Sequence, residues 1–285
     1  MITKTPLPRP LFFVAFFVAG FLALTLATAT AQAADRARIE TFLNVTGFDV
    51  ALDSIALSAE SAPGMIGLTP EDFGGAWDGI ADTVFSLPDM RNQALDYLEE
   101  TLSDAALTHA EAFYATELGQ RLVKAENASH LVEDSDTKHI AGRRIVADLV
   151  QAGDNRVDIL KRMGRAVDAG ESSVKAVQEV QFRFIVAAET AGIIELQLEP
   201  DALKGLLAEQ EDEMRLEMVE SALTSSAYAY QGFTNQELET YSDALETPEM
   251  QEVYRLLNAI QFEITASRYE ELAYRLGKIG PSEDI

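Results

Sequence analysis

The sequence predicts an all-α fold of about ten helices, and three observations support this prediction. Apolar residues recur at spacings of three and four residues in nearly every window from residue 34 onward, as amphipathic helices require. No convincing run of alternating apolar and polar residues between turn signals indicates a strand. Several segments also have the residue order of a helix start, in which a hydroxyl side chain precedes proline or an acid.

Individual elements follow from apolar spacing. The residues expected on buried helix faces are Ile39, Phe42 and Leu43; Phe48, Leu52 and Ile55; Phe73, Trp77, Ile80 and Val84; Val253, Leu257, Ile260 and Ile264. The longest such pattern runs from Val177 to Leu198, and apolar residues on its other faces predict a central helix surrounded by neighbours.

Three segments predict where helices begin, and one predicts a boundary between two helices. Thr69-Pro70-Glu71 and Thr247-Pro248-Glu249 place a hydroxyl at the cap and proline at the first helical position. Thr234 and Glu237 have the spacing of a capping box. Gly153 followed by Asp154 indicates the end of one helix and the start of the next.

Residues 1–33 have the order of a secretory signal peptide. Lys4 and Arg9 precede the apolar run 11–27, and the small-residue sequence Ala31-Gln32-Ala33 predicts cleavage after Ala33. The alternative is an uncleaved membrane anchor, because the run has 17 residues and a spanning helix needs roughly 17 to 25. We therefore expect a periplasmic or secreted protein that meets the membrane only through this segment, if it stays uncleaved.

Composition excludes several classes of protein. The 285 residues include no cysteine, which rules out disulfides, thiolate metal sites and a cysteine nucleophile. The net charge is −25, and it becomes −27 when the two basic residues of the leader are removed. Nucleic acid is therefore not an expected partner, because its phosphates are bound by Lys and Arg. An exported chain without disulfides must rely on its packed core for stability.

An internal repeat predicts two similar helical halves, 34–153 and 154–285, packed on each other. At an offset of 131 residues, 97–128 aligns with 228–259 without gaps and gives 6 identities in 32 positions. The identical pairs are Tyr97 with Tyr228, Leu107 with Leu238, Thr116 with Thr247, Gln120 with Gln251, Asn127 with Asn258 and Ala128 with Ala259. Each copy is expected to hold a capped helix, a turn at the second Thr and a further helix. The alternative is a coincidence between two amphipathic helix pairs.

The segment 102–122, with Phe113-Tyr114-Ala115-Thr116 followed by Gly119-Gln120, resembles the signature of a family of exported bacterial proteins. This is the domain of unknown function numbered twenty fifty-nine. The segment 245–251 is similar, but Met250 stands where the pattern has Gly119. The resemblance implies a helical exported domain, present twice in diverged form, and it brings no catalytic residues with it.

No motif in the sequence indicates a catalytic, cofactor or metal site. His109, His130 and His139 do not have a metal-ligand spacing such as H-E-x-x-H. Nucleophile-elbow, phosphate-binding and dinucleotide-binding motifs are also missing. We therefore predict no cofactor.

One charged segment suggests a partner. Residues 138–165 hold seven basic and three acidic residues, whereas 195–220 hold nine acids and two basic residues. Arg143, Arg144, Arg162 and Arg165 could form a docking patch for an anionic envelope component. The alternative is that these arginines pair with acids inside the fold.

Two functional hypotheses remain. The first is a non-enzymatic exported protein that binds or scaffolds a component of the cell envelope. The second is an envelope hydrolase or transferase that uses a pair of carboxylates in a groove between the two halves. The missing catalytic motifs favour the first.

Overall fold

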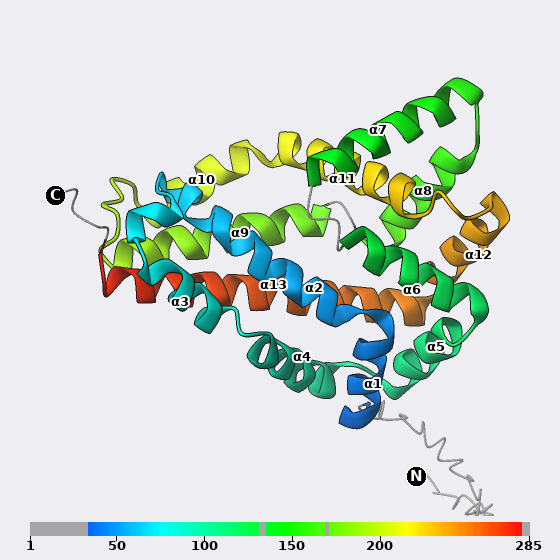
Figure 1. Cartoon of the computed structure of the whole chain (residues 1–285), viewed down its shortest axis with the longest axis horizontal. Helices are drawn as coiled ribbons and strands as arrows, with labels where there is room; N and C mark the ends of the chain where they lie inside the picture. Colours follow the sequence, from blue (N-terminus) through cyan, green and yellow to red (C-terminus); the bar gives the residue numbers. More distant parts are fainter. Residues whose placement is uncertain (1–33, 131–134, 169–170, 281–285) are drawn as a thin grey trace, which may run out of the picture. The chain divides into compact units, whose positions relative to one another are not determined.

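The computed structural model describes residues 34–130, 135–168 and 171–280, so the predicted cleavage site at Ala33 lies outside the described residues. Across these three ranges the chain forms thirteen α-helices and two 3-10 helices and no strand (Figure 1). The all-α prediction is therefore confirmed, with more helices than expected. No helix within these ranges is both long and apolar enough to cross a membrane.

The bounds of the elements up to residue 130 are α1 Arg36–Thr46, α2 Phe48–Ser58, η1 Ala59–Ile66, η2 Pro70–Phe73, α3 Ala76–Val84, α4 Leu87–Thr101, α5 Asp104–Tyr114 and α6 Glu117–His130. The later helices are α7 Ser135–Ala152, α8 Arg156–Ala166, α9 Glu171–Thr190, α10 Pro200–Glu209, α11 Glu211–Ala229, α12 Asn235–Leu245 and α13 Pro248–Gly277.

The central element is α13, a helix of 30 residues. It packs along α9 and also contacts α3, α4 and α5, so elements distant in sequence meet on it (Figure 1). Its ten buried residues lie on several faces, and Met250, Ile264 and Leu272 among them are fully buried. One continuous core runs through the described helices.

The predicted central helix over 177–198 is only partly correct. α9 contains Val177 to Ala187, but it ends at Thr190, and Gly192 follows with a φ of 75°. That left-handed conformation ends a helix and suits glycine, which has no Cβ to clash. Ile193 and Ile194 still pack against the core from the following loop, whereas Leu198 is exposed. Apolar spacing therefore continued past the end of the helix.

The helix expected from Thr69 to Val84 is divided in two. Thr69 and Asp72 form a capping box, but η2 lasts one turn and α3 begins after Gly74 and Gly75. Gly74 has a φ of 57° and a ψ of −149°, a conformation outside the helical region. Phe73 and Trp77 nevertheless both lie in the core, with their ring centroids 6.2 Å apart.

The other predicted helix boundaries are confirmed. The side chains of Thr234 and Thr247 accept hydrogen bonds from the amides of Glu237 and Met250, in the first turns of α12 and α13. Glu237 closes the capping box on Thr234. Gly153 takes a φ of 65° between α7 and α8.

Corresponding pairs of helices are in contact before and after residue 153. α1 contacts α4 and α5, and α8 contacts α11 and α12. α2 likewise contacts α6, and α9 contacts α13. The offset of 131 residues carries α5 onto α12 and the start of α6 onto the start of α13. This correspondence supports the repeat, which stays a prediction.

Contacts between the two sides of residue 153 are also reciprocal. The side chain of Glu252 on α13 accepts a hydrogen bond from the amide of Ser103, the cap of α5. Arg121, which stands 131 residues before Glu252, forms an ion pair of 2.5 Å with Glu237 in the first turn of α12. α13 thus contacts the N-terminus of α5, and α6 contacts the N-terminus of α12.

Gly119 lies at a close approach between α5 and α6. A Cβ at this position would lie 2.5 Å from the carbonyl oxygen of Phe113 and 2.7 Å from the Cα of Tyr114. α5 and α6 therefore meet too closely for any side chain here. At the equivalent position in α13, Met250 is fully buried instead.

Gly119→Ala is predicted to lower the free energy of unfolding by about 1 to 3 kcal/mol, because backbone atoms have to move to accept the methyl group. Gly164→Ala is the control, since a Cβ there meets nothing within 4 Å in the interior of α8. The free energy of unfolding of that variant should instead rise by about 0.5 to 1 kcal/mol, because alanine has a higher helix propensity than glycine. Urea unfolding followed by circular dichroism measures both, and equal effects would contradict the close approach.

Candidate functional site

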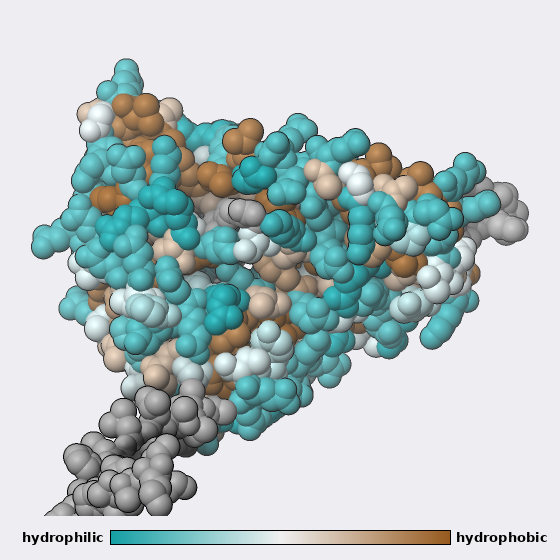
Figure 2. Space-filling model, turned by 180° about the vertical axis from the view of Figure 1, so that it is seen from behind, coloured by the Kyte–Doolittle hydropathy of each residue, from teal (hydrophilic) through white to brown (hydrophobic). Residues whose placement is uncertain are grey.

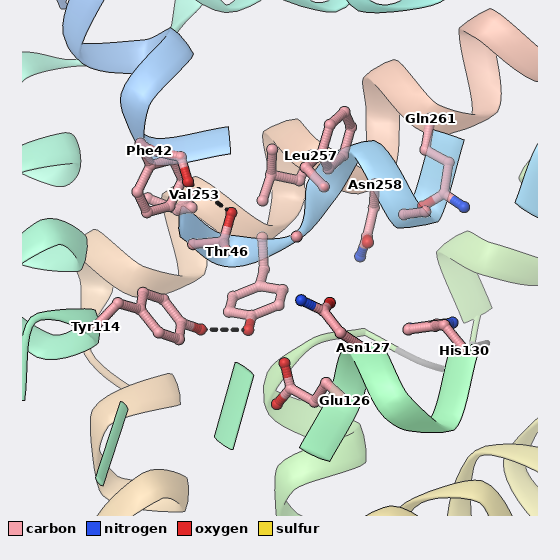
Figure 3. Close-up of a pocket in the computed structure, with 14 residues that line it drawn as sticks. Phe42, Thr46, Tyr114, Glu126, Asn127, His130, Val253, Leu257, Asn258 and Gln261 are labelled. Atoms are coloured by element: carbon pink, nitrogen blue, oxygen red, sulfur yellow. Dashed lines mark hydrogen bonds between the residues drawn. The ribbon is translucent and has the colours of Figure 1, made fainter. Parts of the chain in front are cut away.

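A pocket of about 140 Å³ lies where the corner between α1 and α2 meets α6 and α13. Figure 3 shows Glu126, Asn127 and His130 reaching it from α6, and Asn258 and Gln261 from α13. Its walls include apolar side chains of α1, α2 and α13. The pocket thus combines apolar walls with a few convergent polar groups, as small-molecule sites do.

Asn127 and Asn258, which the repeat alignment pairs, line this same pocket (Figure 3). The amide of Asn258 donates a hydrogen bond of 2.9 Å to the carbonyl of Val167, the residue that ends α8. The side chain of Asn127 lies against Gly47, the residue that ends α1. Each asparagine therefore contacts the end of a preceding 11-residue helix.

Gly47 allows the chain to turn sharply at the pocket wall. Its φ is 73°, and a Cβ would lie 2.0 Å from Oδ1 of Asn127. Both the left-handed backbone and the lack of space exclude a side chain at this position. The α1–α2 corner can therefore approach α6 closely enough to close one side of the pocket.

Glu126 is the acid of the pocket, and tyrosines hold one of its oxygens. Oε1 accepts hydrogen bonds of 2.7 Å from Tyr230 and 3.0 Å from Tyr241. The hydroxyl of Tyr254 lies 2.9 Å from that of Tyr241 and 2.6 Å from that of Tyr114. Five polar side chains from α5, α6, α12, α13 and the end of α11 thus form one network beside the pocket.

The network shifts the ionisation of its members. Burial raises the pKa of Glu126, and the hydrogen bonds from Tyr230 and Tyr241 offset part of that rise because they stabilise the carboxylate. Burial also raises the pKa of each of the four tyrosines, so they stay protonated and can donate. The carboxylate is therefore held at a higher free energy than a solvated one.

Several polar atoms of the pocket have no partner among the described residues. Oε2 of Glu126 accepts no hydrogen bond there, and neither does the side chain of Gln261. His130 also reaches the pocket, and burial together with the nearby Lys138 lowers the pKa of its imidazole. The pocket is thus lined by a carboxylate with a raised pKa and by an imidazole with a lowered pKa.

Comparison with known proteins identifies the segment that forms much of this site. Residues 88–134 match the model of a family described as "Uncharacterized protein conserved in bacteria (DUF2059)". The matched segment is similar to this family and covers 47 of the 285 residues. It spans most of α4 together with α5 and α6, and so includes Tyr114, Glu126 and Asn127. The family resemblance predicted from the sequence is therefore confirmed for this segment. No curated protein and no solved structure matches the chain.

The sequence prediction missed Glu126, although a signal for it existed. Within the DUF2059 segment, Leu122 and Val123 are buried on α6, and Glu126 follows at the spacing that continues their face. An acid on a buried face is unusual and marks a candidate site. The four tyrosines of the network come from four places in the chain, so spacing alone could not bring them together.

One of the four predicted patch arginines pairs with acids of α12, and a second acts on one of these acids through its charge. Arg162 on α8 forms an ion pair of 2.7 Å with Glu246 and a second one with Asp243. The positive charges of Arg162 and Arg165 lower the pKa of Glu246. At this end of the basic segment, the geometry agrees with the alternative prediction, in which the arginines pair with acids inside the fold.

Arg143 and Arg144 lie apart from that contact, on α7. Both are exposed, and neither forms an ion pair within the described ranges. The apolar residues Ile140 and Val150 on the same helix are 61% and 63% exposed. Figure 2 shows brown residues at the end where α7 and α8 lie, at its upper left, as one of several brown patches on a largely teal surface. A docking patch for an anionic partner stays a prediction, carried here by Arg143 and Arg144.

Two of the histidines contact threonine hydroxyls. His109 contacts the hydroxyl of Thr247 at 3.1 Å, and His139 contacts that of Thr224 at 3.4 Å. Across 34–130, 135–168 and 171–280, no group of three or more His, Asp or Glu side chains could hold a metal ion.

Glu126→Gln is predicted to be at least as stable as the wild type near neutral pH, because it removes a half-buried charge and keeps an oxygen for Tyr230 and Tyr241. A pKa raised above the ordinary 4.5 means that the folded protein binds its proton more tightly than the unfolded chain. The wild type should therefore lose stability relative to the variant as pH rises above 4.5, up to the folded pKa.

Glu237→Gln is the matched control, and its effect on stability should have the opposite sign. Hydrogen bonds from Thr234 and the charge of Arg121 lower the pKa of Glu237 to about 2, so its ionised form stabilises the fold. That variant should be less stable than the wild type above pH 4.5, and the difference should vanish as pH falls towards about 2. Urea unfolding across this pH range measures both, and the same sign for the two variants would contradict the assignment.

Proposed function

We propose that the protein is exported and acts in the cell envelope as a non-enzymatic binding protein, with the pocket around Glu126 and Asn127 as its ligand site. The observation that carries the proposal is the combination of unpaired polar atoms and apolar walls at the meeting point of α1, α2, α6 and α13. The order of residues 1–33, with a basic start, an apolar run and Ala31-Gln32-Ala33, supports export.

The composition of the pocket favours binding over hydrolysis. General acid–base hydrolysis of a glycoside uses two carboxyl groups with separated roles. Glu126 is the one acid among the described residues that line this pocket, and Oε1 of its carboxylate is held by two tyrosines. The side chains are thus arranged to hold a fixed charge and to contact a solute.

The size of the pocket limits what it can bind. A cavity of roughly 150 Å³ is large enough for a molecule the size of benzene, whereas sites for larger ligands measure roughly 300 to 1,000 Å³. At about 140 Å³, the pocket suits a small solute and not an oligosaccharide or a peptide.

Two measurements test the proposal. Mass spectrometry of protein recovered from the periplasmic fraction should give a chain that begins at Ala34. A thermal-shift screen of small amines, carboxylates, alcohols and sugars should raise the melting temperature with at least one class. Ala51→Leu is designed to fill the pocket from α2, and it should remove that shift. A chain that begins at Met1 and stays in the cytoplasm would refute export, and a shift that survives Ala51→Leu would refute the site.

A further inference from the structure

The charges of the residues that line the pocket around Glu126 indicate which charge its ligand should carry. Among the described residues that line it, none is Lys or Arg, so no permanent positive charge faces the carboxylate. The one basic group is His130, and burial and Lys138 lower the pKa of its imidazole. Glu126 is half-buried, and a carboxylate that is partly removed from water without a countercharge is costly. A ligand that brings a positive charge offsets this cost.

The geometry of Glu126 leaves one oxygen for such a ligand. The two hydrogen bonds from Tyr230 and Tyr241 both go to Oε1. Oε2 receives none within the described ranges, and Figure 3 shows the carboxylate at the edge of the pocket. The tyrosine network therefore fixes the orientation of the side chain while one acceptor stays available to a donor in the pocket.

The other polar groups suit an ammonium head. The side chains of Asn127 and Gln261 each offer an amide oxygen, and an ammonium group has three donors to satisfy. The rings of Phe42 and Phe48 line the pocket as well. Aromatic faces attract cations and also pack against hydrocarbon. An anion would instead meet the carboxylate and several oxygens at close range.

We propose that this pocket binds a small aliphatic monoamine, whose ammonium group pairs with Oε2 of Glu126 and whose hydrocarbon part lies against Phe42, Phe48 and Leu257. This inference rests on the proposed binding function and adds the class of ligand. The volume limits the amine to about the six non-hydrogen atoms of benzene. A single carboxylate matches one positive charge.

n-Butylamine is the probe, with n-butanol and butyrate as neutral and anionic ligands of similar length. Isothermal titration calorimetry on the mature chain should give one site for butylammonium, with a Kd on the order of 1 mM for so small a ligand. Butanol and butyrate should bind at least tenfold more weakly. Side-chain amide signals of Asn127 and Gln261 should shift in nitrogen–proton NMR spectra when butylammonium is added.

Two charge-neutralising variants separate the pocket from the overall charge of the protein. Glu126→Gln should weaken butylammonium binding at least tenfold while unfolding cooperatively. Glu239→Gln removes the same charge from an exposed position on α12 and should leave the affinity unchanged. Ala51→Leu keeps Glu126 and should also abolish binding. Its loss of binding would show that the ligand needs the space of the pocket and not the charge of Glu126 alone.

The outcomes distinguish this inference from the proposed function. Equal binding of butanol and butylammonium, or unchanged binding by Glu126→Gln, would overturn the amine proposal. If carboxylates, alcohols or sugars bind and Ala51→Leu abolishes their binding, the pocket is a ligand site but not an amine site. If no class of solute binds at the pocket, both proposals fail.

Discussion

The structure depends most on the burial of α13, a helix of 30 residues that packs against helices from both sides of residue 153. A helix with apolar residues on several faces cannot leave any of those faces in water without losing the free energy of their burial. α9 covers one part of α13, and α3, α4 and α5 cover others. Because no cysteine is present, this packing has no covalent crosslink to support it.

The same helix brings the proposed site together. Val253, Tyr254, Leu257, Asn258 and Gln261 of α13 line the pocket, and Tyr254 also joins the tyrosine network beside Glu126. The site is therefore formed by the contact between distant segments, and neither α6 nor α13 contains it alone. At the positions equivalent under the repeat, Glu126 corresponds to Leu257 and Asn127 to Asn258. One side thus supplies charge and the other an apolar wall, which a fully symmetric pair of units could not do.

Much of the fold could be predicted from local sequence, because helix caps and apolar spacing act over a few residues. Thr234 and Thr247 cap helices as their sequence context indicates. The errors arose where backbone conformation overrode apolar spacing. Gly192 ends α9, and Gly74 interrupts the segment that begins at Thr69, although apolar residues continue beyond both glycines.

The candidate site was much less predictable. The repeat singled out Asn127 and Asn258, which do share a pocket, but it gave no reason to choose Glu126. Hydrogen bonds from Tyr230 and Tyr241 join residues 104 and 115 positions apart from Glu126, and such contacts follow from tertiary packing alone. In the basic segment the sequence instead drew attention to a residue that pairs inside the fold. Arg162 stands out in a charge count, but it pairs with Asp243 and Glu246.

The dependence on α13 is tested most directly by cutting the mature chain between Gly153 and Asp154, in the turn that separates α7 from α8. Each fragment alone should show reduced helicity and no cooperative unfolding, because the first leaves its contacts with α13 open and the second exposes that surface of α13. Mixing the two should restore the circular dichroism spectrum and cooperative unfolding of the intact chain. Full helicity and cooperative unfolding of the fragment 154–285 alone would contradict the account.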